Sequence, residues 1–235
     1  MSVYTSLNYA QIESFIGAYN LGPLTSYTGI SAGIENTNYL LNIAQEKFVL
    51  TLYEHLNADE VRPYLDLLVL LGEHESYYPS PLADTQQGHL QLLAGKPAAL
   101  FPCLSGESVR TVTTGQRQSV ASALARLHLS NPALEFQKKN ARNIEWIQQA
   151  AQQISSDLSL QDSMLLEDEL AYQLKVQTHH LTQGIIHADL FKDNVLFVGD
   201  RLTGILDFYA ACRDFYLLDI AITLVELIFI MVVRQ

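Results

Sequence analysis

The sequence has few of the residues that mark the more specialised classes of protein. Its two cysteines, Cys103 and Cys212, can form no disulfide framework and are not spaced as zinc ligands, which indicates a reducing compartment such as the cytoplasm. Only 14 basic residues stand against 25 acidic ones, and the formal charge of −11 argues against a nucleic-acid partner. The first residues also lack the basic and apolar regions of a secretory signal. A globular, cytoplasmic protein is therefore expected.

One stretch is apolar enough to raise the question of a membrane span. Residues 217–233 are almost wholly aliphatic, which approaches the length needed to cross a bilayer. Asp219 and Glu226 interrupt the stretch, and charged side chains are costly inside a membrane. We therefore expect a buried helix and no membrane association.

The most informative segment is HADLFKDN, at residues 187–194. In it Asp189 precedes Asn194 by five residues, and Asp207 follows after a predicted hairpin. This spacing matches the catalytic loop and the metal loop of kinases. In such sites one carboxylate accepts the proton of the attacking hydroxyl, while the amide and the second carboxylate hold Mg²⁺ on the phosphates. A polar turn between two core strands is the alternative for the octapeptide alone. Taken together, the motifs predict a small-molecule kinase that uses ATP and Mg²⁺.

The order of the predicted elements indicates an α+β fold with two lobes. A β-rich amino-terminal lobe, residues 1–104, is expected to end at a hinge. A mostly helical catalytic lobe, residues 105–235, follows it. The first lobe contains predicted helices at residues 8–19 and 59–71 and strands in residues 27–41, 48–53, 89–93 and 97–102. The second contains predicted helices at residues 116–129, 144–155 and 165–181, followed by the hairpin of residues 195–197 and 202–206.

Motifs in both lobes resemble the homoserine kinases of the aminoglycoside phosphotransferase and choline kinase superfamily. They are GISAGIENTNY at residues 29–39, VLTLYE at 49–54, GKPAAL at 95–100 and DLFKDNVLF at 189–197. The resemblance runs from the amino terminus to about Thr223. It implies a two-lobed protein-kinase-like fold with an antiparallel sheet in its amino-terminal lobe. It also implies transfer of the ATP γ-phosphate to the side-chain hydroxyl of L-homoserine, in threonine biosynthesis.

Two other functions remain as alternatives. Within the enzyme class, the acceptor could be choline, methylthioribose or an aminoglycoside. Outside it, the chain could be an inactive, truncated kinase-like remnant. The residues indicate no oligomeric state.

The resemblance also implies roles for individual residues. Asp189 would be the catalytic base, with His187 bracing its loop, and Asn194 and Asp207 would hold the metal. Kinases usually carry a lysine on the third strand, where this chain has Thr51, so the side chain that neutralises the phosphates is left open. Nucleotide contacts are expected from the turn that covers the phosphates, the third strand and the hinge: Gly33, Glu35, Asn36, Asn38, Thr51, Phe101, Cys103 and Leu104.

The carboxyl-terminal end departs from this resemblance. Related kinases continue past the metal loop with further helices, whereas residues after about 225 no longer read like the family. The resemblance therefore implies a truncated chain with an incomplete catalytic lobe and an exposed apolar strip at residues 227–233. Nearby, Asp219 is expected to anchor the catalytic loop rather than take part in chemistry. His128 is expected to be a packed core residue.

Overall fold

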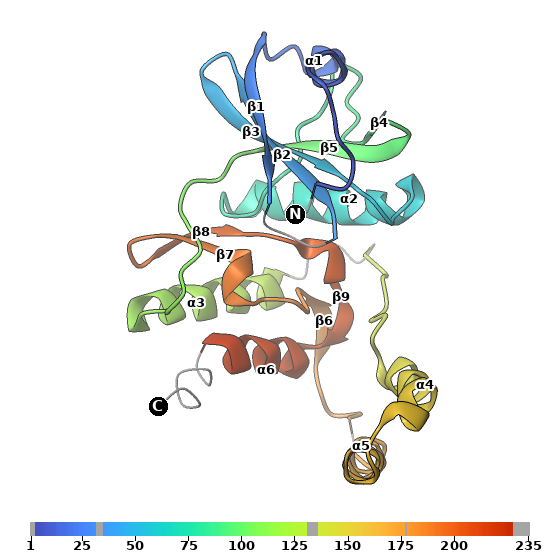
Figure 1. Cartoon of the computed structure of the whole chain (residues 1–235). Coiled ribbons are helices and arrows are strands. Elements are labelled where there is room, and N and C mark those ends of the chain that lie inside the picture. Colours follow the sequence, from blue (N-terminus) through green and yellow to red (C-terminus); the bar gives the residue numbers. More distant parts are fainter. Residues whose placement is uncertain (1–2, 32–34, 131–135, 177, 228–235) are drawn as a thin grey trace.

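The computed structural model describes residues 3–31, 35–130, 136–176 and 178–227. Figure 1 shows an amino-terminal part built on one sheet, above a second part of helices and two short strand pairs. The expected α+β class is therefore confirmed. Gly33 lies outside the described residues, and so does the expected exposed strip of residues 227–233 except for Leu227, which is buried.

The amino-terminal sheet is antiparallel and has the strand order β1-β2-β3-β5-β4. Along β2 the side chains alternate between buried and half-buried, as expected of a strand with two different faces. Ala44 turns the chain between β2 and β3 with a positive φ of 54°, which keeps that connection short. The strands are β1 Leu24–Ile30, β2 Thr37–Ile43, β3 Glu46–Leu52, β4 Gln91–Leu93 and β5 Lys96–Pro102.

Two helices cover the sheet, and both begin at an asparagine cap. Asn8 and Asn57 each form a capping box with the residue three positions later, which satisfies N–H groups of the first turn. Helix α1, Tyr9–Ile16, buries Ile12, Phe15 and Ile16 against the face that carries Tyr39 and Leu41. Helix α2, Ala58–His74, packs with Tyr53 in a different core.

The larger core joins the two parts of the molecule. Leu65 and Leu68 of α2 share it with Val120 of α3 and with Val195 and Phe208 from the region of the catalytic motifs. This packing fixes the predicted catalytic residues beneath the amino-terminal sheet. The elements of the second part are α3 Thr114–Ser130, α4 Ile144–Ile154, α5 Leu160–Gln173, β6 Gln183–Ile186, β7 Val195–Val198, β8 Arg201–Ile205, β9 Cys212–Phe215 and α6 Tyr216–Leu227.

Helices α5 and α6 differ from expectation. Helix α5 begins earlier than predicted because Ser159 caps it, and it ends at Gln173 instead of residue 181. The carboxyl-terminal helix was expected to be buried. This expectation is wrong for the described part of α6, because Leu217 and Val225 are each 55% exposed. An apolar run alone does not reveal how many of its faces find a partner. No helix in the described ranges is both long and apolar enough to cross a membrane.

Candidate active site

A cavity of about 290 Å³ lies between the amino-terminal sheet and the loops that follow β6 and β8. Such a volume lies near the lower end of the range usual for small-molecule pockets. The cavity brings together nearly all the residues expected to contact a nucleotide or a metal, although they lie far apart in the sequence. They are Glu35, Asn36, Asn38, Thr51, Phe101, Cys103, Leu104, Asn194 and Asp207.

The upper wall of the cavity is formed by one face of the sheet. Asn38 and Thr51 lie opposite each other on β2 and β3, and the Thr51 hydroxyl donates a 2.7 Å hydrogen bond to the Asn38 Oδ1. Val49 and Phe101 continue this wall as an apolar surface, and Leu196 and Leu206 also line the cavity. An apolar surface of this kind suits an aromatic ring such as adenine.

The chain leaves the sheet along one edge of the cavity. After β5, the backbone N–H of Cys103 donates to the Lys47 carbonyl at 3.0 Å, so the segment stays extended. Cys103 and Leu104 both line the cavity, in the position expected of the hinge. The Lys47 side chain is exposed at the start of β3, and no lysine or arginine is among the described residues that line the cavity.

The catalytic motif forms a tight loop after β6. The Asn194 side-chain amide donates hydrogen bonds to the Asp189 backbone carbonyl at 2.9 Å and to its carboxylate Oδ2 at 3.0 Å. Ala188 adopts a positive φ of 62°, a conformation that non-glycine residues seldom take. Backbone strain of this sort is concentrated at functional sites, where surrounding contacts hold it in place.

Asp219 supplies those surrounding contacts from below the loop. This fully buried carboxylate accepts hydrogen bonds from the backbone N–H groups of His187 at 3.0 Å and Ala188 at 2.9 Å. It also lies 2.9 Å from the His128 Nε2. Burial alone would raise the pKa of Asp219, but the His128 bond, the neighbouring His187 and the backbone N–H groups lower it instead. The geometry matches the anchoring role expected for Asp219 and the packed position expected for His128.

His187 is buried, and both of its ring nitrogens have hydrogen-bond partners. Its Nε2 lies 2.9 Å from the Leu206 carbonyl, and its Nδ1 accepts the Asp189 backbone N–H at 3.2 Å. Burial lowers the pKa of His187, although Asp219 opposes the effect. A neutral imidazole that donates through Nε2 fits both bonds. His187 therefore hydrogen-bonds to the backbone at Asp189 and Leu206, and it is not among the residues that line the cavity.

Asp207 lies close enough to the carboxylates of Glu35 and Asp189 for their charges to affect its pKa. It follows β8 in a left-handed conformation with φ 63° and ψ 60°, which turns the chain at the cavity. Its side chain is open to the cavity, yet protein surrounds it on most other sides. That burial, followed by the charges of Glu35 and Asp189, raises its pKa to about 6 despite a bond from the Tyr209 N–H. A cation bound here would relieve the repulsion.

The oxygen atoms at this point fit a hard divalent cation. The Asn194 amide nitrogen is occupied by Asp189, which leaves its Oδ1 as an acceptor, and Asp207 offers a carboxylate. Within the described residues there is no group of three or more His, Cys, Asp or Glu side chains placed to hold a metal. Two protein oxygens together with phosphate oxygens and water are a usual set for Mg²⁺.

Sequence reasoning missed several residues that line the cavity, among them Asp193 and Tyr209. The Tyr209 hydroxyl lies 2.7 Å from the Tyr53 hydroxyl. Asp193 sits inside the catalytic motif and could have been found by its position. The tyrosine pair joins residues 156 positions apart, so no local pattern could have revealed it.

Sequence comparison shows similarity to phosphotransferases, and in particular to homoserine kinases. Residues 26–231 match the model of the phosphotransferase enzyme family. Homoserine kinase from Methylobacillus flagellatus is 37% identical over 222 residues, covering 94% of this chain and 70% of the relative. Homoserine kinase from Sinorhizobium medicae is 38% identical over 230 residues, covering 95% of this chain and 70% of the relative. The chain thus spans about 70% of the length of these relatives.

Solved structures agree in fold. A spectinomycin phosphotransferase in complex with ADP and spectinomycin superposes with a TM-score of 0.73 at 13% identity, covering 92% of this chain and 73% of that one. An amicoumacin kinase in complex with AMP-PNP and Ca²⁺ superposes with a TM-score of 0.76 at 16% identity, covering 98% of this chain and 72% of that one. These likenesses confirm the expected two-lobed, kinase-like fold.

Proposed function

The chain belongs to the phosphotransferase enzyme family and, within it, to the homoserine kinases, and from this premise we propose its reaction. It transfers the γ-phosphate of ATP to the side-chain hydroxyl of L-homoserine, giving O-phospho-L-homoserine and ADP as a step of threonine biosynthesis in the cytoplasm. The observation that carries the proposal is that Asn194 and Asp207 line one cavity while the Asp189 carboxylate is hydrogen-bonded to Asn194 and lies close enough to Asp207 to raise its pKa, in a chain 37% identical to a homoserine kinase.

In this proposal residues 1–104 form the nucleotide-binding lobe and residues 105–235 form the catalytic lobe. The apolar wall of Val49 and Phe101 receives the adenine, and the backbone of residues 101–104 meets its edge. Asn36 and Asn38 lie where the phosphates would pass, and Glu35 lies close enough to Asp207 to raise its pKa. Asn194 and Asp207 would hold Mg²⁺ through their side-chain oxygens. The bound ion and nucleotide supply charge neutralisation and the transferable phosphoryl group.

The reacting hydroxyl is handled by Asp189. Its carboxylate orients the acceptor hydroxyl and takes its proton as the oxygen bonds to the γ-phosphorus and the bond to the ADP oxygen breaks. The Asn194 amide holds that carboxylate in a fixed rotamer. His187 and Asp219 act as positioning residues, because they fix the backbone of the loop from beneath.

An acceptor panel tests this proposal. ADP release is measured with L-homoserine, L-serine, choline, methylthioribose and an aminoglycoside. The assay is run on this chain and on a fusion that supplies the part of the M. flagellatus relative outside the match. We expect L-homoserine to give the highest kcat/KM. A higher value for another acceptor would reassign the substrate. ADP release with none of them, in the chain and in the fusion, would contradict kinase activity.

A further inference from the structure

Thr37 lies directly behind the proposed phosphate end of the cavity. It is fully buried at the start of β2, whereas its neighbours in the sequence, Asn36 and Asn38, line the cavity. Successive side chains of a strand point to opposite faces of the sheet, so Thr37 points away from the cavity. Whatever holds Thr37 therefore also sets the position of the two asparagines.

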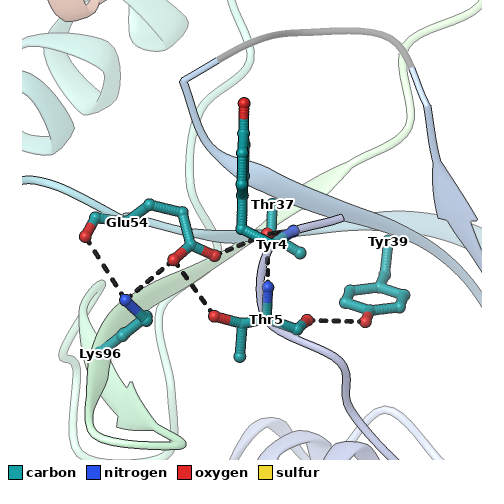
Figure 2. Close-up of polar contacts among 6 residues, drawn as sticks. All are labelled: Tyr4, Thr5, Thr37, Tyr39, Glu54 and Lys96. Atoms are coloured by element: carbon teal, nitrogen blue, oxygen red, sulfur yellow. Dashed lines mark hydrogen bonds and ion pairs between the residues drawn. The ribbon is translucent and has the colours of Figure 1, made fainter. Parts of the chain in front are cut away.

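The Thr37 hydroxyl is saturated with hydrogen bonds (Figure 2). It donates to the Glu54 Oε1 at 2.6 Å and accepts the backbone N–H groups of Tyr4 at 2.9 Å and Thr5 at 3.2 Å. A hydroxyl has one hydrogen to donate and two lone pairs, and all three are used. Residues more than thirty positions apart are thus joined through one atom.

Glu54 extends this network to two more strands. Its Oε2 accepts the Thr5 hydroxyl at 3.1 Å and lies 2.8 Å from the Lys96 ammonium at the start of β5 (Figure 2). The Glu54 side chain is only 5% exposed, and a buried carboxylate is costly unless it is paired. Glu54 follows β3, and three residues before it Thr51 bonds to Asn38 on the cavity side. One carboxylate therefore links β2, β3 and β5 at the end of the sheet next to the cavity.

The amino-terminal segment, residues 3–5, also contacts β1, the strand that pairs with β2. A Cβ atom on Gly29 of β1 would lie 2.8 Å from the Val3 Cγ2, which is closer than real contacts allow. The Tyr39 hydroxyl donates to the Thr5 carbonyl at 2.8 Å and accepts the Leu7 N–H at 3.0 Å. Val3, Tyr4 and Thr5 thus lie against both β1 and β2.

We propose that Thr37 and Glu54 are positioning residues for the nucleotide, acting from the opposite face of the sheet. Together with Tyr4 and Thr5 they hold the start of β2, and so place Asn36, Asn38 and Thr51 for phosphate binding. Neither residue lines the cavity, so their influence on binding passes through these three. This inference rests on the proposed function, because it assumes that the cavity takes a nucleotide.

Thr37→Val tests the inference, because valine keeps the shape and removes the hydroxyl. The dissociation constant for AMP-PNP with Mg²⁺ is measured by calorimetry on the full chain. We expect binding to weaken about tenfold, the size of effect that the loss of one or two net hydrogen bonds produces. Thr37→Ser retains the hydroxyl and should restore binding. The matched control is Thr25→Val, which removes a threonine hydroxyl from β1 whose partner is the Asn42 carbonyl, at the other end of the sheet.

Thermal unfolding of each variant separates positioning from general stability. Positioning predicts weaker nucleotide binding at temperatures where Thr37→Val is fully folded, and in the assay a raised KM for ATP with KM for the acceptor unchanged. Wild-type affinity in the folded Thr37→Val protein would overturn the inference and leave the proposed function intact. Failure of the wild-type chain to bind AMP-PNP would overturn both.

If Thr37→Val does not fold, Thr5→Val provides the same measurement with a smaller change. It removes only the hydrogen bond from the Thr5 hydroxyl to Glu54. The hydrogen bond from the Thr5 backbone N–H to the Thr37 hydroxyl is retained. We expect binding to weaken about threefold, with Thr5→Ser as the restoring variant. Unchanged affinity in Thr5→Val would then count against the inference.

Discussion

The side chain of Asn194 reaches back across the catalytic loop and bonds Asp189 twice, at its backbone carbonyl and at its carboxylate. The two residues cannot move independently, since each conformation of Asp189 is tied to that of the Asn194 amide. The same bonds turn the Asn194 oxygen away from Asp189 and leave it for a cation. These two hydrogen bonds therefore couple the proposed base to the proposed metal site.

Replacement of Asp189 by asparagine should remove the base and keep the shape of the loop. General-base catalysis contributes about 10²–10⁴-fold in rate, so kcat should fall by that factor while the affinity for AMP-PNP changes little. Steady-state kinetics and calorimetry measure the two effects separately. Retention of more than about a tenth of the wild-type kcat would show that Asp189 is not the base.

Asp207→Ala should act on nucleotide binding as well as on rate, because a metal ligand links the protein to the phosphates. We expect AMP-PNP to bind Asp207→Ala equally weakly with and without Mg²⁺, whereas the wild-type chain should show a clear Mg²⁺ dependence. Asp193→Ala is the matched control, since this carboxylate also lines the cavity but is not assigned to the metal. An undiminished Mg²⁺ dependence in the Asp207 variant would contradict the assignment.

Asp219→Ala should destabilise the protein strongly. It leaves the buried N–H groups of His187 and Ala188 without an acceptor, each at a cost of about 1–3 kcal/mol. The free energy of unfolding, measured by denaturant titration, should therefore fall by at least about 2 kcal/mol. Asp200→Ala removes an exposed aspartate that bonds the Thr113 hydroxyl, and it should cost far less. Equal losses in the two variants would argue against an anchoring role for Asp219.

The pH dependence of stability should reveal the charge on Glu54. Burial would raise its pKa, but bonds from Lys96, Thr37 and Thr5 outweigh burial and lower it below 4.5. A carboxyl group whose pKa is lower in the folded state than in the unfolded state stabilises the fold at pH values above the unfolded-state pKa. This stabilisation is lost as the pH falls through the folded-state pKa. Glu54→Gln should therefore be less stable than wild type near neutral pH, and the difference should shrink below pH 4.5. A difference that stays constant across this range would contradict a paired, ionised Glu54.

Local sequence patterns were sufficient to predict the elements on which the site is built. The hairpin after Asn194, the strand that carries Thr51 and the helix capped by Asn57 all appear where their residues indicate. The catalytic motif is equally local, because five residues of one loop set the distance from Asp189 to Asn194. For such features, the information needed lies within a few positions of the chain.

Contacts between distant residues could not be predicted in this way. His128 and Asp219 are 91 positions apart, and Thr5 and Glu54 are 49 apart, yet each pair is joined by a hydrogen bond. The exposure of α6 was also missed, because an apolar run specifies burial only when the tertiary structure supplies partners for every face. Such features depend on packing, which no short window of sequence contains.

The most direct test of the account is identification of the product formed from L-homoserine and ATP. Phosphorus NMR of reactions with the chain, and with the fusion that carries the rest of the M. flagellatus relative, should show O-phospho-L-homoserine appearing in equal amount with ADP. The signal should be absent from the Asp189→Asn proteins. ADP formed without a phosphorylated amino acid, or phosphorylation that survives Asp189→Asn undiminished, would contradict the central claim.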